Sequence, residues 1–222
     1  MSVYFVTGAG TDIGKTYVSC ALLRAWRVAG RSCAALKPVI TGYAPEAMAG
    51  SDSALLLEAA GQGPTEAAIA EISPWRFKAP LAAPLAARAE GRTIDFSAIA
   101  AYCRAQAERA TGPLLVEGAG GVMSPLAEGE TCLDLARALG RPAIFVAGSY
   151  LGAVSHALTG LAVLDAAGVP IAALVLSESQ ENIGLEETRE MIVRLRPDVR
   201  IWLAPRGEPA AWATDLAARL EA

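Results

Sequence analysis

The sequence predicts an α/β fold in which helices flank a mostly parallel, doubly wound sheet. Three observations support this prediction. Short apolar runs with β propensity alternate with helical segments, a glycine-rich turn joins the first strand to the first helix, and a lone acid ends a central strand. The chain has 222 residues, which suits one large α/β domain, so we expect residues 1–222 to form a single domain.

Strands and helices alternate in a regular order. Predicted strands occupy residues 3–6, 33–36, 113–116, 143–146, 171–176 and 199–203. Predicted helices run from the glycine-rich turn to residue 30 and over residues 54–60, 85–89, 96–110, 131–139, 153–167, 186–195 and 209–220. We expect loops over residues 43–52 and the remainder of 61–93, because proline and glycine interrupt any regular pattern there.

Composition narrows the class of protein. Hydrophobic residues make up 53% of the chain, enough for a large core, and the formal charge of −4 argues against a general nucleic-acid binder. The first strand begins almost at the N-terminus, so we expect no targeting peptide. The cysteines are scattered without metal-ligand spacing, which is typical of reduced thiols in a cytoplasmic protein (Cys20, Cys33, Cys103 and Cys132).

An uncharged segment, residues 143–164, is long enough to span a bilayer. Small and polar residues interrupt it (Gly148, Ser149, Gly152, Ser155 and His156). We therefore interpret it as a strand, a loop and a buried helix, and expect no membrane partner. The default role of its histidine is structural.

The glycine-rich turn, residues 8–16, has the form of a phosphate-binding loop. Lys15 is placed to reach the terminal phosphates of a nucleotide, and the Thr16 hydroxyl is placed to bind Mg²⁺. Ala9 lengthens the loop by one residue relative to the pattern G-x-x-x-x-G-K-T. The alternative is a glycine-rich turn with a surface lysine, but the strand before the loop and the helix after it favour nucleotide binding.

Further polar residues follow the predicted strands. Lys37 and Thr41 come after the second strand, and the carboxyl ends of parallel strands form the ligand crevice. Glu117 ends a buried strand and precedes glycines at 118–121, which indicates a metal or substrate site and close approach by a ligand or another backbone. Asp52 opens a predicted helix, where it is either a first-turn acid or a carboxylate that reaches Mg²⁺.

These motifs together resemble those of the dethiobiotin synthetases, ATP-dependent ring-closing enzymes of biotin synthesis. The match runs in order through residues 6–16, KPVITG at 37–42, Asp52, VEGAGG at 116–121 and residues 151–159. The loop alone is generic to ATPases, whereas the KPV-x-[ST]-G and VEGAGG elements are far more specific. The longer loop is also the family's own variant.

The resemblance implies a P-loop NTPase-like fold, a homodimer with the substrate site at its interface, and a ligase that uses ATP as co-substrate and Mg²⁺ as cofactor. The reaction would convert 7,8-diaminononanoate and CO₂ to dethiobiotin, with release of ADP and phosphate. A carbamate would form on one amine, the γ-phosphoryl group would convert it to a carbamic-phosphoric mixed anhydride, and the second amine would close the ring.

The resemblance also implies roles for individual residues. Lys15 and Lys37 would be catalytic, and Thr16, Asp52 and Glu117 would hold the metal. The nucleotide would contact Asp12, Ile13, Gly14, Lys15, Thr16, Tyr17, Asp52, Glu117, Gly118, Ala119, Gly120, Ser177, Pro205, Arg206 and Gly207. The substrate would contact Thr11, Lys37, Thr41, Gly118, Leu151, Gly152 and Ala153, with its carboxylate at residues 152–153 of the neighbouring subunit. Pro80 and Leu81 belong to an uncharged segment, residues 80–84, which either lines a pocket for an apolar substrate chain or packs on the core as an ordinary loop.

Three positions depart from the family pattern. Asp12 stands where a longer glutamate is common, and Tyr150 stands where some relatives carry lysine. Ser177 stands where many relatives place an asparagine that reads the adenine edge. Because one hydroxyl replaces a paired donor and acceptor, we predict looser nucleotide specificity.

Two other functions share the phosphate loop. A regulatory or partitioning ATPase would dimerise on nucleotide binding, but such proteins carry an additional lysine early in the loop and residues 9–13 contain none. A related amide ligase or phosphotransacetylase-associated module would be part of a longer chain. All three functions predict ATP binding, so the substrate must distinguish them.

Overall fold

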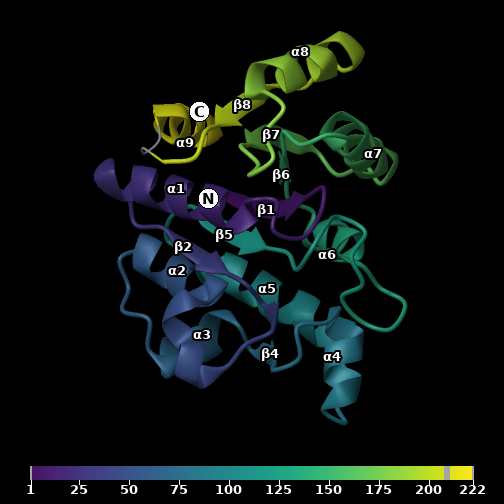
Figure 1. Ribbon diagram of the computed structural model, residues 1–222. Coiled ribbons are helices and arrows are strands. Elements are labelled where there is room, and N and C mark those ends of the chain that lie inside the picture. Colours follow the sequence, from purple (N-terminus) through teal and green to yellow (C-terminus); the bar gives the residue numbers. More distant parts are fainter. Residues whose placement is uncertain (1, 208–210, 222) are drawn as a thin grey trace.

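The computed structural model describes residues 2–207 and 211–221 (Figure 1). A six-stranded sheet has the order β2-β5-β1-β6-β7-β8, and every neighbouring pair is parallel. Its strands are β1 (Val3–Gly8), β2 (Ala34–Leu36), β5 (Leu114–Glu117), β6 (Ala143–Ala147), β7 (Ile171–Ser177) and β8 (Ile201–Ala204). The predicted parallel, doubly wound α/β fold is therefore confirmed.

Helices cover both faces of this sheet. They are α1 (Lys15–Val28), α2 (Asp52–Ala59), α3 (Glu66–Ile72), α4 (Ala83–Ala89), α5 (Phe96–Arg109), α6 (Cys132–Leu139), α7 (Ala153–Ala166), α8 (Leu185–Leu195) and α9 (Ala211–Glu221). Helix α1 packs between α2 and α9, while α5 packs on α6 and α7 on α8. The arrangement places the N-terminus of α1 at the carboxyl edge of β1.

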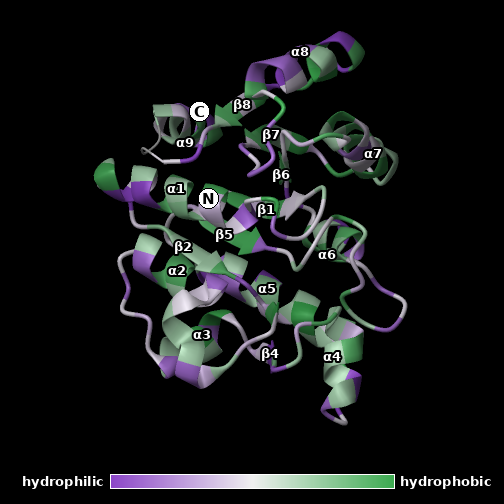
Figure 2. Cartoon of the chain, viewed as in Figure 1, coloured by the Kyte–Doolittle hydropathy of each residue, from purple (hydrophilic) through white to green (hydrophobic). Residues whose placement is uncertain are grey.

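The core lies between the sheet and these helices. All residues of β1, β5 and β6 are buried, as expected for parallel strands covered on both faces. Figure 2 shows the hydrophobic colour of β5 and the polar colour of much of α8. Gly160 lets α7 approach β6, since a Cβ there would lie 2.2 Å from the Phe145 ring.

The prediction of loops over residues 43–52 and most of 61–93 is wrong in part. Residues 75–77 form β4 (Trp75–Phe77), which pairs in parallel with β3 (Val39–Thr41), and a 3-10 helix spans Pro45–Gly50. Helix α3 begins after Thr65, whose side chain accepts a hydrogen bond from the Ala68 N–H. Each of these strands has only three residues, and the paired residues Val39 and Trp75 are 36 positions apart. Strands this short show no hydrophobic periodicity, so the sequence pattern did not reveal them.

The uncharged segment contains β6 and α7, as expected, but α7 is only partly buried. Ala157, Leu161 and Leu164 face the core, whereas Ser155 and His156 are exposed. Among the described residues, the helices are all too short or too polar to cross a membrane. The last predicted helix is observed as α9, and the residue proposed as its start, Pro209, lies outside the described part of the chain.

Candidate active site

The phosphate loop connects β1 to α1 and opens toward the carboxyl edge of the sheet. Asp12 and Gly14 have φ angles of 54° and 101°, and such left-handed residues turn consecutive N–H groups toward one side. The N-cap residue of α1 is Gly14, which has no side chain to accept from the first N–H groups of the helix, so these groups can bind an anion. The Lys15 ammonium donates to the Gly10 carbonyl at 2.7 Å, inside the same loop. This geometry suits a bound polyphosphate.

Strand register brings the catalytic candidates together. Glu117 is paired with Val6, beside the phosphate loop, and Val116 is paired with Leu36 on the other side. Lys37 follows Leu36 directly and is therefore delivered next to Glu117. Parallel neighbours end at the same edge of a sheet, which explains how residues far apart in sequence meet here.

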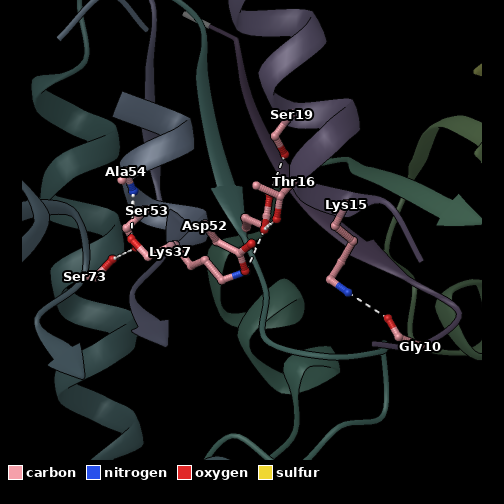
Figure 3. A network of polar contacts seen from close by, with 11 residues as sticks. Gly10, Lys15, Thr16, Ser19, Lys37, Asp52, Ser53, Ala54 and Ser73 are labelled. Atoms are coloured by element: carbon pink, nitrogen blue, oxygen red, sulfur yellow. Dashed lines mark hydrogen bonds and ion pairs between the residues drawn. The ribbon is translucent and has the colours of Figure 1, made fainter. Parts of the chain in front are cut away.

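Glu117 is completely buried and accepts hydrogen bonds from three side chains, two on α1 and one directly after β2. Its Oε1 receives the Thr16 hydroxyl and the Lys37 ammonium, each at 2.7 Å. Its Oε2 receives the Ser19 hydroxyl at 2.7 Å. Figure 3 shows Thr16 and Ser19 on α1 and Lys37 pointing toward Asp52. Three hydrogen bonds to its two oxygens fix the orientation of this carboxylate.

Asp52 lies in the first turn of α2 and also contacts the Lys37 ammonium. Ser51 caps α2 by accepting from the Ala54 N–H, so Asp52 is the first-turn acid of that helix. Its Oδ2 also lies 2.6 Å from the Lys37 ammonium. The side chain of Asp52 is 42% exposed, in contrast to the buried Lys37, and it faces the cleft.

Mutual electrostatics shift the pKa values of this cluster. Burial opposes the charge of Lys37, but Glu117 and Asp52 outweigh it and raise the pKa of its ammonium. Burial also opposes ionisation of Asp52, but Lys37 lowers the pKa of this carboxyl. The pKa of Lys15 is lowered by burial and by repulsion from Lys37. An incoming phosphate would relieve that repulsion.

The donor set of this cluster fits Mg²⁺. Thr16, Asp52 and Glu117 offer hydroxyl and carboxylate oxygens, the ligands that this ion prefers. Within residues 2–207 and 211–221, no three or more His, Cys, Asp and Glu side chains gather into a metal cage. An ion held by few protein oxygens relies on phosphates and water for the rest of its shell, which is the usual behaviour of Mg²⁺ at nucleotides.

The glycines after Glu117 allow close backbone packing, as the sequence suggested. A Cβ on Gly121 would lie 3.2 Å from the Gly8 oxygen and from the backbone of Gly10. The Val122 N–H donates to the same Gly8 carbonyl at 2.9 Å. Residues 118–121 therefore support the phosphate loop from beneath.

A cleft of about 1320 Å³ lies above these residues. Most predicted site residues line it: Thr11, Asp12, Ile13, Gly14, Lys15, Thr16, Tyr17, Lys37, Thr41, Asp52, Pro80, Leu81, Ala119, Gly120, Ser177 and Arg206. Glu117 and Gly118 lie beneath it, since Glu117 is buried and a Cβ on Gly118 would lie 3.1 Å from the Phe5 ring.

The far end of the cleft is formed by the carboxyl ends of β7 and β8. The buried Ser177 packs against the phosphate loop, because a Cβ on Gly14 would lie 2.3 Å from its Oγ. The Tyr17 hydroxyl donates to the Pro205 carbonyl at 2.6 Å, and Arg206 Nε donates to the Glu178 carbonyl at 2.8 Å. Gly207 follows with a φ of 105°.

Leu151, Gly152 and Ala153 do not line this cleft. Leu151 and Gly152 lie exposed just before α7, with Leu151 87% exposed and Gly152 at a φ of 97°, whereas Ala153, the first residue of α7, is buried. Tyr150, just before them, does line the cleft, and its hydroxyl lies 2.6 Å from Nδ1 of His156. The single histidine is thus paired on the surface, rather than packed in the core.

Sequence reasoning missed other members of the site. Ser19 lies three residues after Thr16, a spacing that places both on one face of α1, and this was the available signal. Ser124 stabilises the backbone of residues 118–121, since its Oγ accepts a hydrogen bond from the Gly121 N–H at 2.7 Å. Glu178, Ser179 and Gln180 extend the cleft beyond Ser177. The local sequence of residues 178–180 does not differ from that of an ordinary loop, so it gave no signal for a site.

Comparison of the sequence with known proteins identifies full-length relatives. A family model described as an AAA domain matches residues 2–201. An ATP-dependent dethiobiotin synthetase BioD of Phenylobacterium zucineum is 49% identical over 225 residues, which cover 100% of this chain and 96% of that protein. The protein of the same name from a Caulobacter species is 50% identical over 94% of this chain and 90% of its own length.

Solved structures with the same fold are much more distant in sequence. The MinC:MinD cell division complex of Aquifex aeolicus contains a chain with a TM-score of 0.57 at 11% identity, covering 99% of this chain and 86% of that one. The hydrogenase maturation factor HypB of Archaeoglobus fulgidus also reaches 0.57, at 12% identity, covering 99% and 90%. At this identity the similarity concerns the fold alone.

Proposed function

The chain belongs to the ATP-dependent dethiobiotin synthetase family, ligases of biotin biosynthesis, and we propose that its cleft joins 7,8-diaminononanoate and CO₂ at the expense of ATP. The main support for this reaction is the arrangement of one lysine and two acids. Lys37, Asp52 and Glu117 meet beside the phosphate loop, so a carbamate and a γ-phosphate can be held within one charged cluster. We infer that residues 1–222 act as one ligase domain.

The chemistry requires activation of a weak electrophile. One amine of the substrate adds to CO₂ and loses a proton, giving a carbamate. A carbamate oxygen attacks the γ-phosphorus, the bond to ADP breaks, and a carbamic-phosphoric anhydride forms. The second amine attacks the carbonyl carbon, the C–O bond to phosphate breaks, and dethiobiotin is released. Such phosphoryl transfer depends mainly on positioning and charge neutralisation.

The phosphates are proposed to sit on the loop and the start of α1. The Lys15 ammonium, which donates to the Gly10 carbonyl here, would turn to the terminal phosphates when they bind. The Thr16 hydroxyl, Asp52 and Glu117 would hold Mg²⁺, directly or through water. When bound, the ion adds neutralising charge at the phosphates. The other proposed contacts of the phosphates are backbone groups of Asp12, Ile13, Gly14 and Tyr17.

The carbamate end of the substrate is proposed to face Lys37. Its ammonium bridges Asp52 and Glu117 and can neutralise charge that moves from carbamate to phosphate during transfer. Thr11 and Thr41 line the cleft on either side and offer hydroxyl donors. Pro80 and Leu81 form an apolar wall there that suits the hydrocarbon chain. Gly118 would allow close approach from below.

The base is proposed to occupy the cleft between Ser177 and Arg206. Tyr17 ties α1 to the segment after β8 through the Pro205 carbonyl, which gives this pocket a fixed wall. Gly207 would complete it, with Ala119 and Gly120 nearer the phosphates. Ser177 offers one hydroxyl to the base edge, so discrimination among bases should be weak.

A homodimer would complete the substrate site. The N-terminal turn of α7 is a natural carboxylate site, but Leu151, Gly152 and Ala153 lie outside the cleft of their own chain. The exposed side chain of Leu151 offers apolar surface for a second copy. Light scattering of the wild type and of Leu151→Asp tests this: a dimeric wild type and a monomeric variant support the proposal, and a monomeric wild type or a variant that stays dimeric contradicts it. We place the enzyme in the cytoplasm, where its free buried cysteines remain reduced.

A labelled-carbon assay tests the proposed reaction. The purified protein is incubated with radiolabelled bicarbonate, diaminononanoate and Mg-ATP, and label is sought in dethiobiotin. Label in the product together with equimolar ADP supports the reaction. ATP hydrolysis without labelled dethiobiotin would contradict it and favour a regulatory ATPase.

A further inference from the structure

Ser19 is a buried serine that the proposed chemistry does not use. It lies one turn beyond Thr16 on α1 and is 0% exposed. Its hydroxyl donates to Oε2 of Glu117 at 2.7 Å. This hydrogen bond pairs two buried polar groups inside the charged cluster, and it can also orient the Glu117 carboxylate.

The two oxygens of Glu117 have different surroundings. Oε1 accepts from Thr16 and Lys37, the groups that border the cleft. Oε2 accepts from Ser19, on the side away from Lys37 (Figure 3 shows Ser19 deeper along α1 than Thr16). Because Thr16 and Ser19 lie on one rigid helix, they fix the carboxylate at two points relative to the phosphate loop.

We propose that Ser19 is a positioning residue, which holds Oε2 of Glu117 so that only Oε1 is presented to the metal and nucleotide. This inference rests on the metal site in the proposed function. When Thr16 and Lys37 turn to their ligands, Oε1 loses its two donors and becomes free to accept a metal or a metal-bound water. Oε2 keeps its bond to Ser19, so the carboxylate does not rotate. Partners that orient a ligand in this way affect metal affinity strongly.

Ser53 provides a matched control. It is also 0% exposed, lies in α2 beside Asp52, and makes a buried hydroxyl–hydroxyl hydrogen bond of 2.7 Å to Ser73. Ser53→Ala therefore removes the same atom from an equally buried position near the site, without touching Glu117. Any general cost of losing a buried hydrogen bond affects both variants alike.

Direct binding of Mn²⁺ in the presence of ADP, followed by electron paramagnetic resonance, tests the proposal without turnover. We expect Ser19→Ala to weaken Mn²⁺ binding by about tenfold. Ser53→Ala and Ser19→Thr, which keeps the hydroxyl, should stay within about twofold of the wild type. ADP affinity measured without metal should also be unchanged in Ser19→Ala. This pattern is expected only if Ser19 acts through the metal ligand.

A double variant sharpens the test. In a Glu117→Gln background, Ser19→Ala should change Mn²⁺ affinity by less than about twofold, because the residue it positions has already been altered. If Ser19→Ala lowered Mn²⁺ affinity as much in the Glu117→Gln background as in the wild type, the proposal would be overturned. Equal Mn²⁺ affinities for Ser19→Ala and Ser53→Ala would also overturn it. If the wild type with ADP binds no Mn²⁺, both the proposed metal site and this inference fail. If the wild type binds it and Ser19→Ala binds equally well, only the inference fails.

Discussion

The ammonium of Lys37 lies 2.7 Å from Oε1 of Glu117, although 80 positions separate these residues in the sequence. Adjacent strands β2 and β5 end together, and this places the lysine beside the acid. The same ammonium lies 2.6 Å from Asp52. One cation thus bridges the two carboxylates assigned to the metal.

Lys37→Ala should lower turnover strongly while leaving the fold intact. We expect kcat to fall by about 10²–10³-fold, the usual cost of removing one preorganised donor from a site of developing charge. Lys78→Ala is the matched control, because Lys78 is an exposed lysine away from the cleft. Dethiobiotin formation and circular dichroism are the measurements. Near-normal catalysis in Lys37→Ala would remove this lysine from the active cluster.

Lys37 should also compete with divalent cations before nucleotide binds. In nucleotide-free protein its ammonium neutralises Asp52 and Glu117, so Lys37→Met leaves two uncompensated carboxylates. We expect Lys37→Met to bind Mn²⁺ at least about tenfold more tightly than the wild type in titration calorimetry. Lys78→Met, which removes the same charge elsewhere, should have no effect. Weaker binding in Lys37→Met would contradict the competition.

Nucleotide selectivity should be loose. Ser177 supplies one hydroxyl at the far end of the cleft, and this limits discrimination among base edges. We expect kcat/KM values for ATP, GTP and CTP within about tenfold, a difference of about 1.4 kcal/mol. Competition between pairs of nucleotides in one reaction measures the ratios directly. A strong preference for ATP would indicate a reader of the base other than Ser177.

Gly121→Ala should disturb the phosphate loop from beneath. The new Cβ would lie 3.2 Å from the backbone of Gly10, so the loop must shift, at a cost of about 1–3 kcal/mol. We expect a lower melting temperature and a higher KM for ATP. Gly63→Ala is the control, since a Cβ at that position would have no other atom within 4 Å. Equal behaviour of the two variants would show that the loop accommodates the methyl group.

Thiol labelling should be slow in the native protein and rise with pH. Burial raises the pKa of Cys20 and Cys103 to about 12 and that of Cys132 to about 11. A raised pKa lowers the thiolate fraction, by about 10³-fold at pH 8 for a pKa near 12 relative to a free cysteine. Labelling with a maleimide, followed by mass spectrometry, should be complete only after unfolding. Rapid modification of the folded protein at pH 8 would contradict this.

The sequence by itself determined the alternation of strands and helices, the phosphate loop and the lone acid, Glu117, at the end of a central strand. These features are local: apolar periodicity, glycine spacing and the residue that follows a buried run. Lys37 and Glu117 were therefore predictable as individuals, whereas Asp52 was assigned to the metal only through the family resemblance. The cleft contains most of the residues predicted for it.

Only the tertiary structure decided how these residues touch. Helix α3 and the β3–β4 pair were missed, because short elements are stabilised by distant partners rather than by their own patterning. The contacts of Lys37 with both acids depend on the order of the strands in the sheet. The hydrogen bond from Ser19 to Glu117 depends on how α1 packs against β5. Contacts of this kind arise when separate elements pack, and packing is a property of the folded chain as a whole.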